Sequence, residues 1–599
     1  MTSEIHLCDQ CGHTLHPDIR FTKFSSDTST QLRSFFWPPN NDGTDVYREI
    51  DGIDNEIQKF NEEIERLRGS FSLLENARDG LVRLKAGRSA LYSPIRKIPI
   101  ETLELIFSFC SRLPELDHSQ TISQHCREPK QVAFVSLPIL SVAQTCALWR
   151  EICLRKPEFW TDLVFRFDAL YQTTPYTNTL RESSLTPLVT QYLSYSKSSP
   201  ITIDFHAFGP RQTESDSSFG VPDFHEFVIG LLSILLAEAE RWRSVVLALD
   251  YKLFHLDNFP QNGPIHMLAN SQSGAVVFPH LENLSVIVAQ ENMSQHVRWE
   301  PHFARCVSTA PISQLMIPSC RGLDLPADRL TVLTFQDFEF SSIRILKHCQ
   351  NLQRLQILSY HSGSDSLNQS TSYSFPHLSH FEISLIGCDE EPNAPDLFKV
   401  LALPSLATLI VKGEADDDGA SPQWDMDAFS TMMSCSRDSL KTLNLYDVEM
   451  TSADVVEILS LTPHLTHFTC HLDGPMGIAN DDEETDCPMF TVLDNLRVAS
   501  DHDALEGGST DLLPIARAIA LLKHLVHLDL SNTWYAVDNA TLKAACDVLE
   551  SRFDSRDCMD LEYFRLITCR LHGVGERNLG RFNDLASRPG CRYTIVNSA

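Results

Sequence analysis

The sequence predicts an α/β protein in which a curved array of repeated strand-and-helix units follows two helical segments. Three observations lead to this architecture. Apolar residues are spaced by four and three from Val46 to Leu81, two amphipathic helices are expected between residues 89 and 160, and one strand pattern recurs through residues 161–599. Residues 1–44 show none of these patterns, and we expect them to form a flexible N-terminal segment.

Residues 45–88 have the 3.5-residue period of a coiled-coil helix. The two apolar positions of the heptad are occupied by Ile50, Ile57 and Ile64, and by Ile53, Phe60, Leu67 and Leu74. The period indicates a possible homodimer through this helix. The alternative is an amphipathic helix that packs on its own chain, because Gly69 and Gly80 would each cost an isolated helix about 1 kcal/mol relative to alanine.

Residues 89–160 predict a small all-helical segment with an internal insertion. Pro99 can begin a helix, and a polar stretch, residues 111–137, separates that helix from a second one, which Pro157 ends. The first helix places on one face Leu103, Ile106, Phe107 and Cys110, and the second places together Val142, Cys146, Trp149 and Cys153. Each apolar face requires a partner to cover it.

From residue 161 onward, an apolar residue, two variable residues, an apolar residue, one variable residue and a third apolar residue recur. This is the strand signature of leucine-rich repeats, and it predicts a horseshoe-shaped α/β solenoid. Clear instances begin at Leu281, Ile312, Leu330, Leu352, Leu378, Leu406, Leu440, Leu465, Leu493, Leu525 and Leu561. Looser strands are expected within residues 163–167, 201–205 and 245–249, and a last helix and strand within residues 579–598.

Side chains that flank the middle apolar residue of each strand should point onto the concave face of the solenoid, where such arrays usually bind. The candidates for substrate binding on that face are Arg354, Gln356, His380, Tyr446, His467, Arg497, Asp529 and Tyr563. A mixed surface of Tyr, His and Arg suits protein recognition, because these side chains supply contact area and directional hydrogen bonds. The alternative is an ordinary solvated strand face, which every such repeat has.

The helical segments resemble an F-box, specifically that of the fungal F-box-like family with a heptad helix and a leucine-rich array. The matching residues are Ser93-Pro94-Ile95-Arg96, Ile98-Pro99-x-Glu101-x-Leu103-x-x-Ile106-Phe107, Cys146-x-x-Trp149-Arg150 and Pro157-x-x-Trp160. The resemblance implies docking on a Skp-type adaptor, which tethers the chain to a cullin scaffold. The adaptor-binding residues would be Ile98, Pro99, Leu103, Ile106, Phe107, Leu140, Cys146 and Trp149. Alternatively, Leu103, Ile106 and Trp149 pack against the rest of this chain.

Charge and composition argue against nucleic-acid binding, secretion and insertion into a membrane. Lys and Arg total 49 against 79 Asp and Glu, and the net charge of −30 opposes binding to nucleic-acid phosphates. The N-terminus lacks the features of a secretory signal, and the longest apolar stretch, residues 228–237, is half the length that a membrane-spanning helix needs. Seventeen scattered cysteines indicate buried thiols in a reducing compartment, so we expect a cytoplasmic or nuclear protein.

The sequence contains no complete motif for catalysis or for a cofactor. Cys8 and Cys11 with His16 begin a zinc knuckle, but Phe21 stands where the fourth ligand should be, so two free thiols are the favoured interpretation. No Walker loop, metalloprotease motif or nucleophile elbow occurs. We therefore expect a non-catalytic chain without cofactor or metal, which is either the substrate-recognition subunit of a Skp–cullin–F-box ubiquitin ligase or a leucine-rich scaffold without ligase association.

Overall fold

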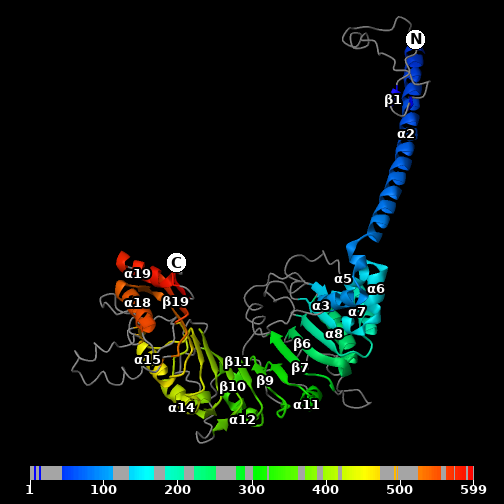
Figure 1. The fold of residues 1–599 in the computed structure, drawn as a ribbon. Helices are drawn as coiled ribbons and strands as arrows, with labels where there is room; N and C mark the ends of the chain where they lie inside the picture. Colours follow the sequence, from blue (N-terminus) through cyan, green and yellow to red (C-terminus); the bar gives the residue numbers. More distant parts are fainter. Residues whose placement is uncertain are drawn as a thin grey trace, which may run out of the picture. The chain divides into compact units, whose positions relative to one another are not determined.

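The protein is described from a computed structural model (Figure 1). The described residues are 6–8, 13–14, 44–111, 134–167, 182–207, 221–250, 278–289, 301–319, 323–361, 372–386, 396–415, 421–471, 492–493, 496, 522, 524–554, 561–571, 574–588 and 591–597. The chain divides into two compact units, Met1–Leu105 and Ile106–Ala599. Each unit is described by itself.

The first unit is dominated by α2 (Thr44–Leu91), a single helix of 48 residues that confirms the helix predicted for residues 45–88. Its four glycines do not interrupt it, and a Cβ added at Gly69 or Gly80 would meet nothing within 4 Å. Before α2, β1 (His6–Cys8) pairs antiparallel with β2 (His13–Thr14). After it come the 3₁₀ turn η1 (Pro94–Lys97) and α3 (Ile100–Ser111), which begins directly after Pro99 and crosses the unit boundary.

The second unit is built on one sheet of sixteen strands, which confirms the α/β class and is parallel except at its N-terminal edge, where β3 and β4 are antiparallel. In order across the sheet the strands are β3 (Phe134–Ser136), β4 (Asp162–Arg166), β5 (Ile201–Ala207), β6 (Trp242–Asp250), β7 (Asn283–Ala289), β8 (Gln314–Ile317), β9 (Val332–Phe335), β11 (Arg354–His361), β13 (His380–Ile386), β15 (Thr408–Glu414), β16 (Thr442–Tyr446), β17 (His467–His471), β18 (His527–Val537), β19 (Tyr563–Leu571) and β20 (Arg592–Asn597). The sixteenth strand, β10 (Phe338–Glu339), pairs with β11 beside this path, and β12 (Tyr373–Ser374) pairs with β14 (Leu401–Ala402) separately.

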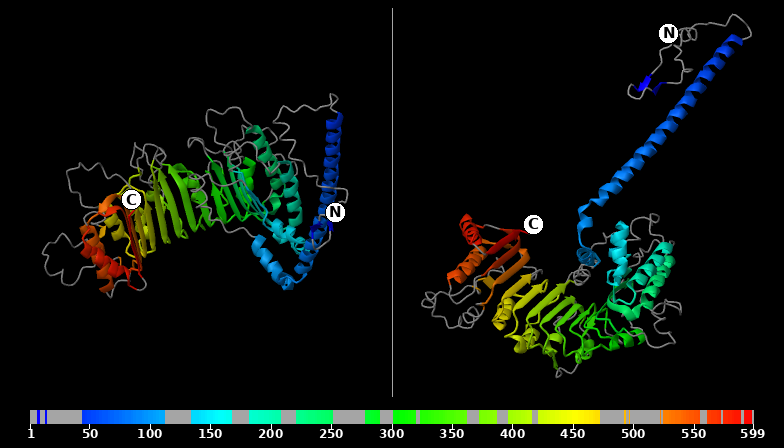
Figure 2. Two further views of the ribbon diagram at one scale, coloured as in Figure 1. Left: turned by 90° about the horizontal axis from the view of Figure 1, so that it is seen from above. Right: turned by 45° about the vertical axis from the view of Figure 1, so that its right-hand side comes forward.

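Helices cover one face of this sheet, the outer side of its curve in Figure 2. They are α5 (Pro138–Thr145), α6 (Ala147–Arg155), η2 (Pro157–Trp160), α7 (Glu182–Ser196), α8 (Val221–Ala237), η3 (Ala239–Arg241), α11 (Pro301–Thr309), η5 (Phe340–Ser342), α12 (Ile343–Leu346), α13 (Asp396–Val400), α14 (Met426–Ser436), α15 (Ser452–Leu461), α18 (Asn539–Asp554) and α19 (Glu576–Ala586). We call the opposite face of the sheet the inner face.

The apolar residues of the recurring pattern form the core between strands and helices. In the repeat that contains β16, Leu440, Leu443 and Leu445 are completely buried, whereas Thr442 and Asn444 are partly exposed. This alternation is the two-residue period of a strand, so the pattern selects which side chains face the helices. The capping box of α15, in which the side chains of Thr451 and Asp454 bond each other's backbone N–H groups, fixes the start of the next helix.

Two tryptophans make the same hydrogen bond in two repeats that are separated by α7 and β5. The indole N–H of Trp160 donates to the carbonyl oxygen of Cys153 at 2.8 Å, and that of Trp242 donates to Leu235 at 3.0 Å. Each tryptophan lies seven residues beyond its acceptor. Trp160 is the last residue of η2 and lies two residues before β4, whereas Trp242 directly follows η3 and begins β6. The segment α6–η2–β4 therefore repeats the arrangement of α8–η3–β6.

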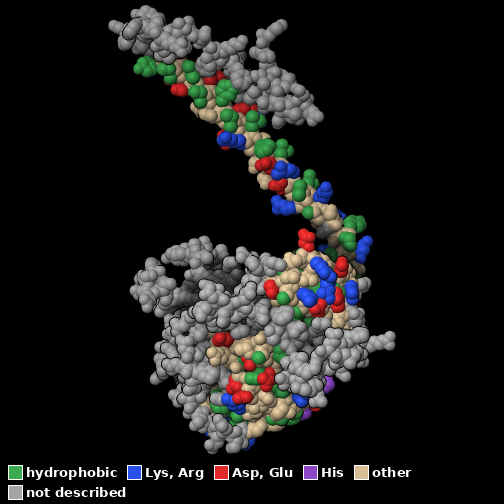
Figure 3. All heavy atoms as spheres, turned by 90° about the vertical axis from the view of Figure 1, so that its left-hand side faces the viewer, with side chains coloured by type: hydrophobic (Ala, Val, Ile, Leu, Met, Phe, Trp, Pro, Cys, Tyr) green, Lys and Arg blue, Asp and Glu red, His purple; other side chains and the backbone are tan. Residues whose placement is uncertain are grey.

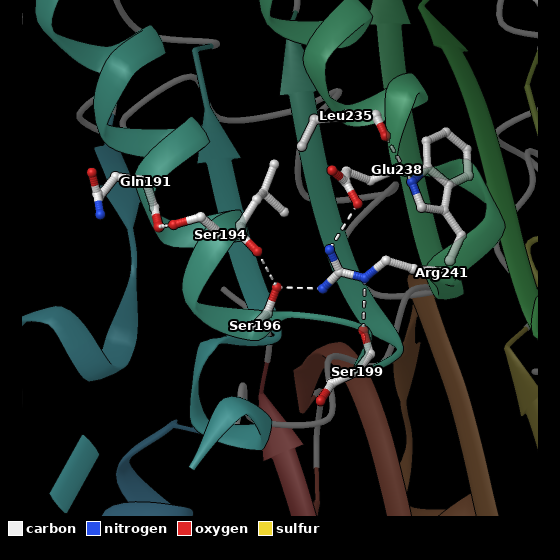
Figure 4. Close-up of polar contacts among 9 residues, drawn as sticks. Gln191, Ser194, Ser196, Ser199, Leu235, Glu238 and Arg241 are labelled. Carbon is white, nitrogen blue, oxygen red and sulfur yellow. Dashed lines mark hydrogen bonds and ion pairs between the residues drawn. The ribbon is translucent and has the colours of Figure 1, made fainter. Parts of the chain in front are cut away.

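Arg241 joins the repeat of α7 and β5 to the repeat of α8 and β6 (Figure 4). Its guanidinium bonds the hydroxyl of Ser196 at the end of α7, the carbonyl oxygen of Ser199 at 3.1 Å, and the carboxylate of Glu238 at 2.7 Å. Ser196 is completely buried, and its hydroxyl also donates to the carbonyl of Leu193. One cation thus satisfies polar groups at the turns between α7 and β5 and between α8 and β6.

Two local expectations are wrong. The pattern at Leu493 does not form a strand: the described residues Val492, Leu493 and Leu496 are helical and buried, and β17 pairs directly with β18. The second helix expected between residues 138 and 156 is two helices, α5 and α6, because Cys146 between them has an extended backbone (φ −158°, ψ 168°). The other strands expected from residue 161 onward are present, as are the last helix and strand.

Candidate functional site

The residues expected to bind an adaptor are partly buried within the chain. Leu103 is 2% exposed and Phe107 is 1% exposed, and the ring of Phe107 packs on Trp149 of α6 with 4.9 Å between ring centroids. Burial of an aromatic side chain of this size stabilises a fold by a few kcal/mol. Leu103 and Phe107 are therefore core residues, as the alternative interpretation held for Leu103, and the expectation that they present a docking face is wrong.

The remaining expected adaptor residues are accessible to different degrees. Ile106 is 42% exposed on α3 and Pro99 is exposed, whereas Ile98, Leu140, Cys146 and Trp149 are half-buried. Trp160, from the last matching motif, is 2% exposed and packs on Tyr192 and Tyr195 of α7, with ring centroids 5.1 and 4.7 Å away. Trp160 consequently anchors the end of the helical segment to α7.

Sequence reasoning missed two exposed apolar residues of α3. Leu105 is 58% exposed and Phe109 is 68% exposed, and together with Ile106 they lie on the side of the helix away from Leu103 and Phe107. The spacing of 105 and 109 was the available signal, since residues four apart share a helix face. We call Leu105, Ile106 and Phe109 the α3 ridge.

On the inner face, parallel pairing aligns side chains into three rows. The first inner row runs Arg354, His380, Thr408, Thr442, His467, His527 and Tyr563. The second runs Gln356, Glu382, Ile410, Asn444, Thr469, Asp529 and Arg565, and the third runs Lys412, Tyr446, His471 and Ser531. The candidate substrate residues of the described strands thus lie on one face, as predicted, and Arg497 lies outside the described residues.

Glu382, Lys412 and His380 form an ion cluster on β13 and β15. The ammonium of Lys412 lies 2.6 Å from one oxygen of Glu382, and the imidazole of His380 lies 4.0 Å from the other. Burial alone would raise the pKa of Glu382, but the neighbouring His380 and Lys412 outweigh it and lower that pKa from 4.5 to about 2. Glu382 is therefore charged throughout the neutral range.

Stacked rings occupy the far end of the first inner row. The imidazoles of His467 and His527 stack with centroids 5.4 Å apart, and the ring of Tyr563 lies 4.1 Å from His527 at an interplanar angle of 4°. Burial, and then the charge of His467, lower the pKa of His527, while Asp529 opposes them. The lowered pKa favours the neutral form of His527, whose ring lies between those of His467 and Tyr563.

Two other expected substrate residues, Gln356 and Asp529, are more buried than side chains on a solvated strand face. Gln356 and Asp529 are each 7% exposed, and the side chain of Gln356 accepts a hydrogen bond from the hydroxyl of Thr334 at 3.4 Å. Asp529 lies 3.6 Å from the guanidinium of Arg565.

Tyr446 is half-buried and meets His471 edge to face, with 4.7 Å between the ring centroids. Burial raises the pKa of Tyr446, so its hydroxyl stays protonated.

The inner face of β6, β7 and β8 carries an apolar cluster. Val246, Ala248, Ile287 and Met316 form a buried cluster there, with Leu358 packed against it. Beside it, Asp204 bridges Arg166 at 2.8 Å and His206 at 2.7 Å, and all three side chains are buried. The pKa of Asp204 is low: burial would raise it, but His206 and Arg166 dominate. The accessible polar rows therefore begin near β11.

Metal chemistry finds no support in the described part of the chain. No group of three His, Cys, Asp or Glu side chains in it could hold a metal ion. His464 stacks on His524, and His467 pairs with His527 on the neighbouring strand, so these histidines occupy equivalent places in two repeats. Of the proposed zinc-knuckle residues, Cys8 lies in β1, and Cys11 and His16 lie outside the described residues.

Comparison with known proteins supplied no relative: no family model matches this chain, and none of the curated proteins matches it significantly. Among the described helices, none is both long enough and apolar enough to cross a membrane.

Proposed function

We propose that the chain is the substrate-recognition subunit of a Skp–cullin–F-box ubiquitin ligase, with a leucine-rich-repeat solenoid as its substrate-binding part. The solenoid assignment is supported by the recurrence of one apolar pattern in strands that pair in parallel with matching register, from β4 to β20. Such a subunit positions a substrate and needs no active site of its own, because holding two reactants in one assembly raises their effective concentration.

The observation that carries the proposal is the α3 ridge. Two large apolar side chains, Leu105 and Phe109, and the neighbouring Ile106 lie exposed on a helix whose other face is already packed. Exposed apolar side chains gathered on one helix are typical of a face that a partner covers. We infer that a Skp-type adaptor docks on this ridge, and that Leu103 and Phe107 support it from beneath.

The inner rows are the proposed substrate surface. Tyr563 and His527 supply stacked rings, and Arg354 is exposed at the other end of the first inner row. Aromatic and arginine side chains contribute most to protein interfaces. Arg354→Glu and Tyr563→Ala should each reduce substrate capture while adaptor binding is retained.

The test is affinity purification of the full chain from cells, followed by identification of the bound proteins. We expect an adaptor and a cullin with the unmodified chain, and their loss with Ile106→Asp plus Phe109→Asp, because two charges would be placed in an apolar interface. Lys347→Asp plus Gln350→Asp, at two exposed positions after α12, is the matched control and should keep both proteins. Adaptor retained by the ridge variant would refute docking on α3.

A second function has one observation in its favour. Because Leu103 and Phe107 are packed inside the chain, the helical segment is covered in part without an adaptor. A leucine-rich scaffold without ligase association needs no adaptor, so the packing of this segment within the chain would be sufficient for it. Substrate proteins recovered without adaptor or cullin from the unmodified chain would select the scaffold.

A further inference from the structure

Most of the apolar seam of α2 is exposed, and its residues Phe60 and Leu67 are half-buried. Ile57 is 51% exposed, Phe71 63% and Leu74 70%, and Ile50, Ile53, Ile64 and Leu81 are exposed as well. The repeat from Ile50 to Leu81 spans more than four heptads, whereas three or four suffice for a coiled coil. Hydrophobic side chains lie at the surface along the helix in Figure 3.

The two halves of α2 carry opposite charge. Residues 44–65 contain eight Asp or Glu and two Lys or Arg, and residues 66–91 contain two Asp or Glu and six Lys or Arg. The N-terminal half therefore has a net charge of −6 and the C-terminal half +4. Some of these charges pair one turn apart, as in Glu65 with Arg68 at 2.6 Å, but such surface pairs leave the charge of each half unchanged.

The charges of α2 complement those of a second α2 only when the two helices run antiparallel. In a parallel pair in register, the acidic halves would face each other, and Arg78, Lys85 and Arg88, which occupy seam positions, would each meet its own copy. In an antiparallel pair each acidic half faces a basic half, and Arg78 comes beside Ile53 and Asp54 of the second copy. Like charges in a seam are costly, so the charges select the antiparallel arrangement.

We infer that α2 binds the α2 of a second copy of this chain as an antiparallel coiled coil. The register that matches apolar layers places Ile50 against Leu81, Ile57 against Leu74 and Ile64 against Leu67 of the second copy. This self-association goes beyond the receptor function proposed above and does not depend on it. It gives each assembly two inner faces and two α3 ridges.

Sedimentation velocity of the full chain tests the pairing and its direction. At 50 mM NaCl we expect a dimer at micromolar concentration, and its dissociation constant should rise at least about tenfold at 500 mM because opposite charges are screened. A parallel pair would instead tighten with salt, since like charges would be screened. A tighter dimer at high salt, or a monomer at 50 µM in both buffers, would overturn the inference.

Charge reversal supplies a matched pair of variants. Glu49→Lys, Asp54→Lys and Glu56→Lys change positions that flank the seam, and should weaken the dimer at least about tenfold at low salt. The control reverses three acids on the outer side of the helix, Asp51→Lys, Glu62→Lys and Glu65→Lys, and should weaken it less. Equal effects of the two sets would refute seam pairing, because only total charge would then matter.

A zero-length carbodiimide cross-link reads the orientation directly. Lys85 and Glu49 lie about 54 Å apart along one continuous helix, so a bond between their side chains can form only between two chains. The antiparallel register brings Lys85 beside Glu49 of the second copy. We expect cross-linked peptides that join Lys85 to Glu49, and a dimer that yields none of them would overturn the antiparallel arrangement.

Discussion

Lys412→Met should lower the free energy of local unfolding of β13 and β15. The size of this loss depends on how strongly Lys412 stabilises the charged form of Glu382. A fall of the Glu382 pKa from 4.5 to about 2 corresponds to roughly 3 kcal/mol in favour of the charged form, at about 1.4 kcal/mol for each pKa unit. His380 shares this stabilisation, and the Lys412 side chain is 44% exposed, so solvent screening leaves about 1 kcal/mol for Lys412. A loss of that size makes local opening about fivefold more frequent.

Hydrogen exchange measured by mass spectrometry on the peptides of β13 and β15 is the appropriate assay. At pH 7 these peptides should exchange about fivefold faster in Lys412→Met than in the unmodified chain. The pKa of Glu382 is depressed in the folded state, so its contribution is complete above pH 4.5 and is lost as the pH falls toward 2. The difference between the two proteins should therefore shrink at pH 3. Lys441→Met, at an exposed lysine, is the control. Equal exchange at pH 7, or a difference that grows at pH 3, would refute the reasoning.

Three further outcomes are expected. Phe107→Ala should cost about 3–5 kcal/mol and make α3 susceptible to limited proteolysis, and resistance equal to that of the unmodified chain would show that the contact with Trp149 is dispensable. Because burial lowers the pKa of His527 in the folded state, β18 should lose protection from exchange as the pH falls from 7 to 5, and His527→Gln should reduce that loss. Iodoacetamide at pH 8 should label the exposed Cys110 and Cys435 and spare Cys470, whose pKa burial raises to about 12; labelling of Cys470 at a similar rate would contradict its burial.

Strand positions could be predicted from the sequence because the pattern itself encodes burial. Leu443 and Leu445 alternate with polar residues, and a two-residue alternation is incompatible with a helix face. The same reasoning failed at Leu493 and Leu496, because a three-residue spacing also fits one side of a helix. Short apolar patterns of this kind are ambiguous without their neighbours.

Accessibility of the candidate sites could not be predicted in the same way. The apolar stripe of α3 is evident in the sequence, but which residues the chain covers depends on distant partners such as Trp149, more than 40 positions after Phe107. Likewise, the pairing of strands placed Gln356 beside Thr334 and Asp529 beside Arg565, and these neighbours limit the exposure of side chains that the pattern alone would leave in solvent.

The shared tryptophan arrangement of α6 and α8 bears on where the chain can be cut. A fragment that begins at residue 161, where the strand pattern starts, would lose Trp160 and with it the indole wedged against Tyr192 and Tyr195. Its first strand, β4, would also lose its antiparallel neighbour β3 and become an unprotected edge, ready to aggregate. A soluble fragment for crystallisation or binding work should instead start before Ile100, so that α3, whose Phe107 packs on Trp149, is kept together with β3, α5, α6 and η2.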